Sequence, residues 1–133
     1  MKPENKWIDD WNIGIVPSRE HDISVKLLNY FENFWNDQNL ENKSKSTRNR
    51  YSSALHALGG YLVEQAISDG SINKTADELL SDCVGPDEGP LIHQDNEDWQ
   101  DELDMVCRKF YKFISRNANK IGAPNREDRG GKP

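Results

Sequence analysis

The sequence predicts an all-α protein: a compact bundle of four helices with an N-terminal arm and a disordered C-terminal tail. Apolar residues recur at spacings of three and four in several separate segments, which is the pattern of an amphipathic helix. No segment alternates apolar and polar residues as a strand does, and the last residues are rich in glycine, proline and charge. We expect the arm at 1–18, the bundle at 19–120 and the tail at 121–133.

The arm contains two tryptophans one helical turn apart, Trp7 and Trp11, before Gly14 and Pro17 interrupt any long helix. We expect an arm or short turn whose tryptophans lie against the main body, because two exposed indoles would leave a large apolar area in water. If the two indoles are exposed, they form a docking site.

The first long helix is predicted from residue 19 or 22 to residue 36, with Ser18 or Asp22 as its N-cap. Its apolar stripe consists of Ile23, Leu27, Tyr30, Phe31 and Phe34. The second helix is predicted at 47–67, with Ser46 as N-cap. Its stripe consists of Thr47, Tyr51, Leu55, Leu58 and Leu62.

The second helix contains a glycine pair, Gly59 and Gly60, which disfavours a helix by about 1 kcal/mol per residue relative to alanine. Such a pair is tolerated where another element approaches closely or where the helix bends.

A short third helix is predicted at 76–83, opened by a capping box of Thr75 and Glu78. The fourth helix, at 97–117, is capped by Asn96, and its acidic start and basic end match the helix dipole. Its apolar stripe consists of Trp99, Leu103, Val106, Cys107, Phe110, Phe113 and Ile114.

Residue patterns for catalysis are absent from the sequence. The three histidines, His21, His56 and His93, have no cysteine or histidine partner at metal-ligand spacing. No glycine pattern for phosphate and no nucleophile-elbow sequence is present. We therefore expect a protein that is not an enzyme and that uses no cofactor and no metal.

Cys83 and Cys107 fall at apolar positions of predicted helices, so we expect small buried thiols, with a disulfide as the alternative. No run of about 18 apolar residues is present, and the polar N-terminus lacks the pattern of a signal peptide. The expectation is a cytoplasmic protein without a membrane partner.

Charge is segregated along the chain, whose net charge is −6. Residues 75–107 include 11 acidic residues and no lysine or arginine, whereas residues 42–50 include four basic residues and no acidic one. Residues 108–133 include eight basic residues and two acidic ones. This distribution predicts one face of each sign, although the net charge argues against a nonspecific coat on nucleic acid.

The stretch from Ser44 to Leu62 resembles the second helix of the SAM-like core-binding domain that precedes the catalytic domain of tyrosine recombinases, the phage integrases. The matching positions are Thr47, Tyr51, Leu55, Leu58, Tyr61 and Leu62. The helix before it and the short and long helices after it come in the same order, so the resemblance covers residues 22–117.

The resemblance implies a domain that contacts double-stranded DNA without the catalytic residues needed to cut it. The candidate contacts are basic residues at the start of the second helix and in the fourth helix, together with the Thr47 hydroxyl, which can donate a hydrogen bond to a phosphate: Lys43, Lys45, Thr47, Arg48, Arg50, Arg108, Lys109, Lys112 and Arg116.

Two other interpretations remain open. The basic residues can simply solvate a loop and complement the dipole of the fourth helix. Alternatively, the chain is an acidic protein-interaction module whose partner is a basic protein, contacted by residues 75–104, or a groove that accepts the Trp7 and Trp11 arm.

Overall fold

The computed structural model describes the backbone of residues 2–121 and the side chains of residues 2–116. Its elements are α1 (Lys6–Trp11), α2 (Pro17–Asp37), η1 (Leu40–Asn42), α3 (Lys45–Ala66), η2 (Asp69–Ser71), α4 (Ala76–Cys83) and α5 (Glu97–Ile121). Helices are the only regular secondary structure of the described residues, which have no strand, and this confirms the all-α prediction. Residues 122–133 of the predicted tail lie outside the described residues.

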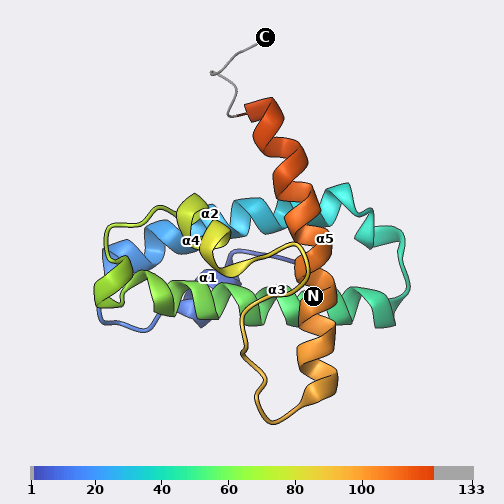
Figure 1. The fold of residues 1–133 in the computed structure, drawn as a ribbon, viewed down its shortest axis with the longest axis horizontal. Helices are drawn as coiled ribbons and strands as arrows, with labels where there is room; N and C mark the ends of the chain where they lie inside the picture. The colour runs from blue at the N-terminus through green and yellow to red at the C-terminus, as the bar shows by residue number, and fades with distance from the viewer. Residues whose placement is uncertain (1, 122–133) are drawn as a thin grey trace.

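The helices α2 and α3 lie side by side and antiparallel, and α5 crosses them at a steep angle and extends past both (Figure 1). Ring pairs join α2 to α5, with centroids of Phe31 and Phe34 at 5.4 and 5.1 Å from that of Phe110. All three rings are fully buried. The predicted stripes of α2, α3 and α5 therefore meet in one core.

The N-terminal arm is part of this core, because α1 packs on α2 and α3. Trp7 and Trp11 are buried, at 4% and 3% exposure, which confirms that the tryptophans lie against the main body and leaves no exposed indole pair for docking. The indole N–H of Trp11 donates to the carbonyl of His56 at 2.9 Å. The Trp11 ring lies directly over Gly59, so the glycine pair serves a close approach.

The helix starts agree with the sequence in two cases out of four. Thr75 and Glu78 form the predicted capping box, and the Asn96 carboxamide accepts the N–H of Trp99 at 3.0 Å. Ser46 was the wrong cap for α3: the helix begins at Lys45, and Ser44, which has the extended backbone of an N-cap, accepts the N–H of Thr47.

The predicted caps of α2, Ser18 and Asp22, are also wrong. The helix begins earlier, at Pro17, with Val16 as its N-cap residue and no side-chain cap of the usual kind. Proline is favoured in the first helical turn because its missing N–H has no partner there in any case. The carboxylate of Glu20 instead accepts hydrogen bonds from the backbone N–H groups of residues 13–16.

Trp99 was predicted to lie in the core, but its side chain is 60% exposed. It shares the phase of the α5 stripe with Leu103, which is buried. Its ring lies at the surface where α5 crosses α3, near Ser53 and Ala54, and not inside the core.

Candidate functional site

The start of α3 carries two of the predicted basic residues on either side of its N-cap. Lys43 and Lys45 are exposed, and they flank Ser44. The hydroxyl groups of Ser44 and Thr47 lie 3.1 Å apart and hydrogen-bond each other, and Thr47 is half-buried. The hydroxyl of Thr47 is therefore engaged with the N-cap residue Ser44. The ammonium groups of Lys43 and Lys45, by contrast, face solvent.

The two arginines that follow differ in what they contact. Arg48 donates through Nη1 to the carbonyl of Lys43 at 2.8 Å, and so closes the turn between η1 and α3. Arg50 is 56% exposed, and its Nε lies 3.9 Å from a carboxylate oxygen of Glu102 on α5. Arg48 is thus a structural residue, while Arg50 has only a long, solvated ion pair.

The basic residues of α5 divide in the same way. Arg116 donates to the carboxylate of Asp37 at the end of α2, at 2.9 Å. Arg108 donates to the carbonyl of Asp87, in the loop between α4 and α5, at 3.1 Å. Lys109 and Lys112 are exposed. Within the part of the chain that the structure describes, no hydrogen bond or ion pair holds their ammonium groups or those of Lys43 and Lys45.

Helical geometry places three of the four α5 residues on one side. Residues of an α-helix are rotated by about 100° each, so positions 102, 109, 112 and 116 fall within about 80° of one another. This side contacts Arg50 through Glu102 and Asp37 through Arg116, so it faces the junction of α2 and α3. We call Lys43, Lys45, Arg50, Lys109, Lys112 and Arg116 the basic surface. Arg108 points to a different loop and does not belong to it.

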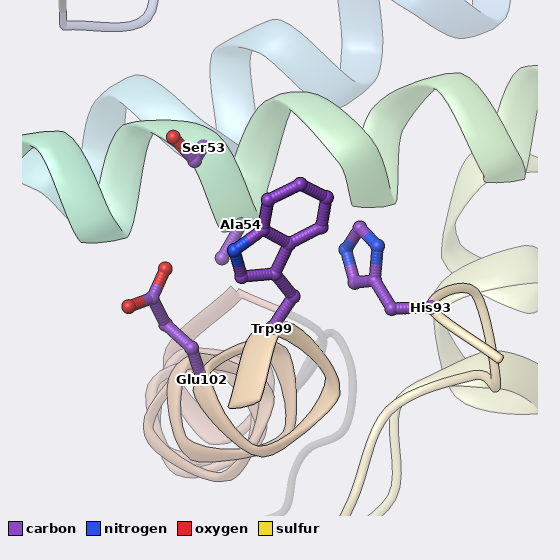
Figure 2. Close-up of a pocket in the computed structure, with 5 residues that line it drawn as sticks. All are labelled: Ser53, Ala54, His93, Trp99 and Glu102. Atoms are coloured by element: carbon purple, nitrogen blue, oxygen red, sulfur yellow. The ribbon is translucent and has the colours of Figure 1, made fainter. Parts of the chain in front are cut away.

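A pocket of about 330 Å³ lies where α5 crosses α3, next to the basic surface. It is lined by Ser53, Ala54, His93, Trp99 and Glu102. The indole of Trp99 stands between the carboxylate of Glu102 and the ring of His93 (Figure 2). The two rings meet edge to face, with centroids 5.6 Å apart. The sequence did not predict this pocket, because His93 comes from a loop without periodic signal.

Gln100 fixes the loop that supplies His93. Its Oε1 accepts the backbone N–H groups of Ile92 and His93 at 3.0 and 2.9 Å, and its Nε2 donates to the carbonyl of Pro90 at 2.9 Å. Nε2 also donates to Asp104, which accepts the N–H of Gly89. One face of α5 thereby sets the path of residues 89–93 and with it one wall of the pocket.

Metal-ligating side chains and thiols are the other candidate groups among the described residues. No group of three metal-ligating side chains occurs among the described residues. Cys83 and Cys107 are both free thiols, half-buried and fully buried respectively. Burial, with a smaller contribution from Asp104, raises the pKa of Cys107 to about 12, so this thiol stays protonated and unreactive. Within residues 2–121, no helix is long and apolar enough to span a membrane.

Comparison of the chain with protein-family models, with curated proteins and with solved structures found no match.

Proposed function

We propose that the chain is a non-catalytic helical domain that contacts double-stranded DNA through the basic surface, in the manner of the integrase core-binding domains that it resembles. The observation that carries the proposal is the approach of the basic side of α5 to the elements next to the other basic residues. On this side Glu102 lies 3.9 Å from Arg50 of α3, and Arg116 bonds Asp37 at the end of α2. Phosphates recognise such a surface because lysine and arginine replace condensed counterions.

The internal partners of the two arginines do not oppose this function. An exposed ion pair contributes only about 0–1 kcal/mol to stability. A phosphate can therefore replace Asp37 or Glu102 as the partner of the arginine with little loss of free energy. The first turn of α5 is distant from Arg116. Glu97 and Arg116 are 19 positions apart on one helix, about 28 Å, whereas charges are screened over about 8–10 Å at physiological salt. Arg50 is the member of the basic surface that lies near an acidic residue of α5, because its Nε is 3.9 Å from Glu102.

The lysines give the sharpest test, because reversing Arg48 would also break the turn that it closes. We expect a fluorescently labelled duplex to bind at about 50 mM salt with micromolar affinity, measured by anisotropy. The double variants Lys43→Glu with Lys45→Glu, and Lys109→Glu with Lys112→Glu, should each weaken binding at least about tenfold and lower the salt slope by about 2.

Lys26→Glu is the matched control. Lys26 is exposed on α2, about 16 Å along the helix from Asp37, and should leave the affinity within about twofold. Absence of binding at low salt, or an effect of only one of the two lysine pairs, contradicts the proposal of a single surface. An equal effect of Lys26→Glu would mean that only net charge matters.

A second candidate function is an acidic protein-interaction module, favoured by a separate observation. Trp99, in the acidic first turn of α5, is 60% exposed, and Leu91, in the loop before that turn, is 64% exposed. Exposed apolar side chains near charge of one sign are a common feature of protein-binding surfaces. Titration with a peptide rich in arginine tests this function, since no binding at low salt would exclude it.

A further inference from the structure

Trp99 differs from the other tryptophans of the chain. Trp7, Trp11 and Trp35 are at most 4% exposed, whereas Trp99 is 60% exposed. Its ring nevertheless has ordered surroundings, since the loop carrying His93 is held by the hydrogen bonds of Gln100. A large indole that is exposed and flanked by fixed groups is the arrangement of a recognition site rather than of a core residue left uncovered.

The groups around the indole select a cation. The aromatic face of a tryptophan attracts positive charge, and Glu102 adds a carboxylate that is 30% exposed at the side of the pocket. Ser53 lines the α3 side of the pocket, with its hydroxyl directed away from the indole (Figure 2). The nearby start of α5 contributes only acidic charge, through Glu97, Asp98 and Asp101.

The same groups favour a guanidinium over an ammonium. A guanidinium is flat, so it can stack on the indole and at the same time donate two hydrogen bonds to one carboxylate. Arg50 approaches Glu102 from α3, at 3.9 Å, so its charge competes with a bound guanidinium for this carboxylate. Because that contact is longer than a hydrogen bond, the carboxylate oxygen of Glu102 remains available as an acceptor.

We propose that the pocket of Ser53, Trp99 and Glu102 binds an arginine side chain presented by a basic segment of a partner protein. The volume of about 330 Å³ is at the lower end for ligand sites, which suits one side chain better than a cofactor. The complementary charge of residues 95–102 attracts the rest of the basic segment. This inference rests on the second candidate function and is independent of DNA binding.

The first probe is N-acetyl-arginine methylamide, titrated while the indole N–H of Trp99 is followed by NMR. We expect saturable shifts with a millimolar dissociation constant, confined to Trp99 and the residues that line the pocket. The citrulline analogue has the same shape without the charge, and should bind at least about tenfold more weakly; the lysine analogue should also bind more weakly than arginine. Equal binding of citrulline, or a preference for lysine, overturns the proposal.

Variants distinguish binding in the pocket from a general attraction to the acidic surface. Trp99→Ala should weaken binding more than about tenfold and Glu102→Gln about fivefold, whereas Glu97→Gln, an exposed acid outside the pocket, should change it less than about twofold. The exposure of Trp99 makes its replacement tolerable for folding, which circular dichroism verifies. Unchanged binding by Trp99→Ala overturns the proposal.

An arginine-rich peptide distinguishes the remaining outcomes. If the peptide binds wild type and Trp99→Ala equally, the acidic surface interacts without the pocket, and only this inference fails. If it does not bind at all, the second candidate function fails as well. If a chain ending at residue 121 shows a shifted Trp99 signal before any ligand is added, the occupant is the C-terminal segment of the chain itself, and the proposal of a partner is overturned.

Discussion

Glu20 is the side chain on which the entry into α2 depends. It is 1% exposed, and each of its oxygens accepts two backbone N–H groups: Oε1 those of Ile13 and Gly14 at 2.6 and 2.9 Å, and Oε2 those of Ile15 and Val16 at 2.9 and 2.7 Å. Burial on its own raises the pKa of Glu20, but the four N–H donors together lower it below the ordinary value of 4.5. The folded state therefore favours the ionised carboxylate.

Glu20→Gln should destabilise the fold by about 2–4 kcal/mol, because the amide nitrogen cannot accept the N–H groups that it faces. Since the pKa of Glu20 is lowered on folding, its stabilisation is present above about pH 4.5 and is lost as the pH falls through the folded-state value. Urea unfolding from pH 3 to pH 7 measures both effects. The variant should show a shallower loss of stability in acid than wild type.

The control for this prediction is Glu32→Gln, which alters an exposed glutamate on the same helix. It should change the free energy of unfolding by less than about 0.5 kcal/mol. If Glu20→Gln behaved like this control, the carboxylate would not be organising residues 13–16.

Side chains with local partners were predictable at this scale, and those with loop partners were not. Thr75, Glu78 and Asn96 bond backbone groups within three residues, so a sequence pattern is sufficient to identify them. Glu20 and Gln100 instead serve N–H groups of irregular loops. No periodicity specifies the path of such a loop, so the sequence gives no signal for these two residues.

At the scale of elements, the contact of α1 with α3 depends on the absence of a side chain. Trp11 lies directly over Gly59, where an added Cβ would fall well inside the indole ring. At Gly60, the same addition would meet Trp11 Cδ1 at 3.4 Å, an ordinary van der Waals distance. The two adjacent glycines therefore have different roles.

Gly59→Ala should destabilise the protein by about 1–3 kcal/mol, because the indole must move out of its site. Gly60→Ala, its matched control, should be neutral or stabilising by up to about 1 kcal/mol, because alanine favours the helix. Urea denaturation of the two variants measures the difference. Equal effects would mean that helix propensity, rather than the approach of Trp11, explains the pair.

The long helices were predictable because each repeats its apolar residues over several turns. The helix α1 has only six residues, too few for a periodic signal, although its tryptophans indicated burial. The periodicity of α5 predicted that Trp99 lies on the core-facing side of the helix. A periodic pattern, however, does not predict the angle at which two helices cross. At this crossing Trp99 lies at the surface beside Ser53 and Ala54 of α3, and so it lines the pocket.

At the scale of the whole molecule, the first 12 residues belong to the core and should not behave as a detachable arm. Burying Trp7 and Trp11 removes about 150–250 Å² each from water, or about 8–12 kcal/mol for the pair as an upper estimate. This is comparable to the total stability of an ordinary domain, about 5–15 kcal/mol.

A chain without residues 1–12 should therefore be largely unfolded at 25 °C. Helicity by circular dichroism and the urea midpoint measure this, with Ile15→Ser as a control that alters an exposed residue near the deleted segment. A shortened chain with the helicity and midpoint of wild type would show instead that α1 is dispensable.

The burial of three indoles and the exposure of the fourth give the molecule two optical signals. A hydrated quencher such as caesium reaches the Trp99 ring and is kept from Trp7, Trp11 and Trp35. The quenchable part of the emission then reports whether the pocket is covered, and the protected part reports whether the interior is closed. One fluorescence-quenching experiment on the unlabelled protein can thus distinguish occupancy of the pocket from unfolding of the protein.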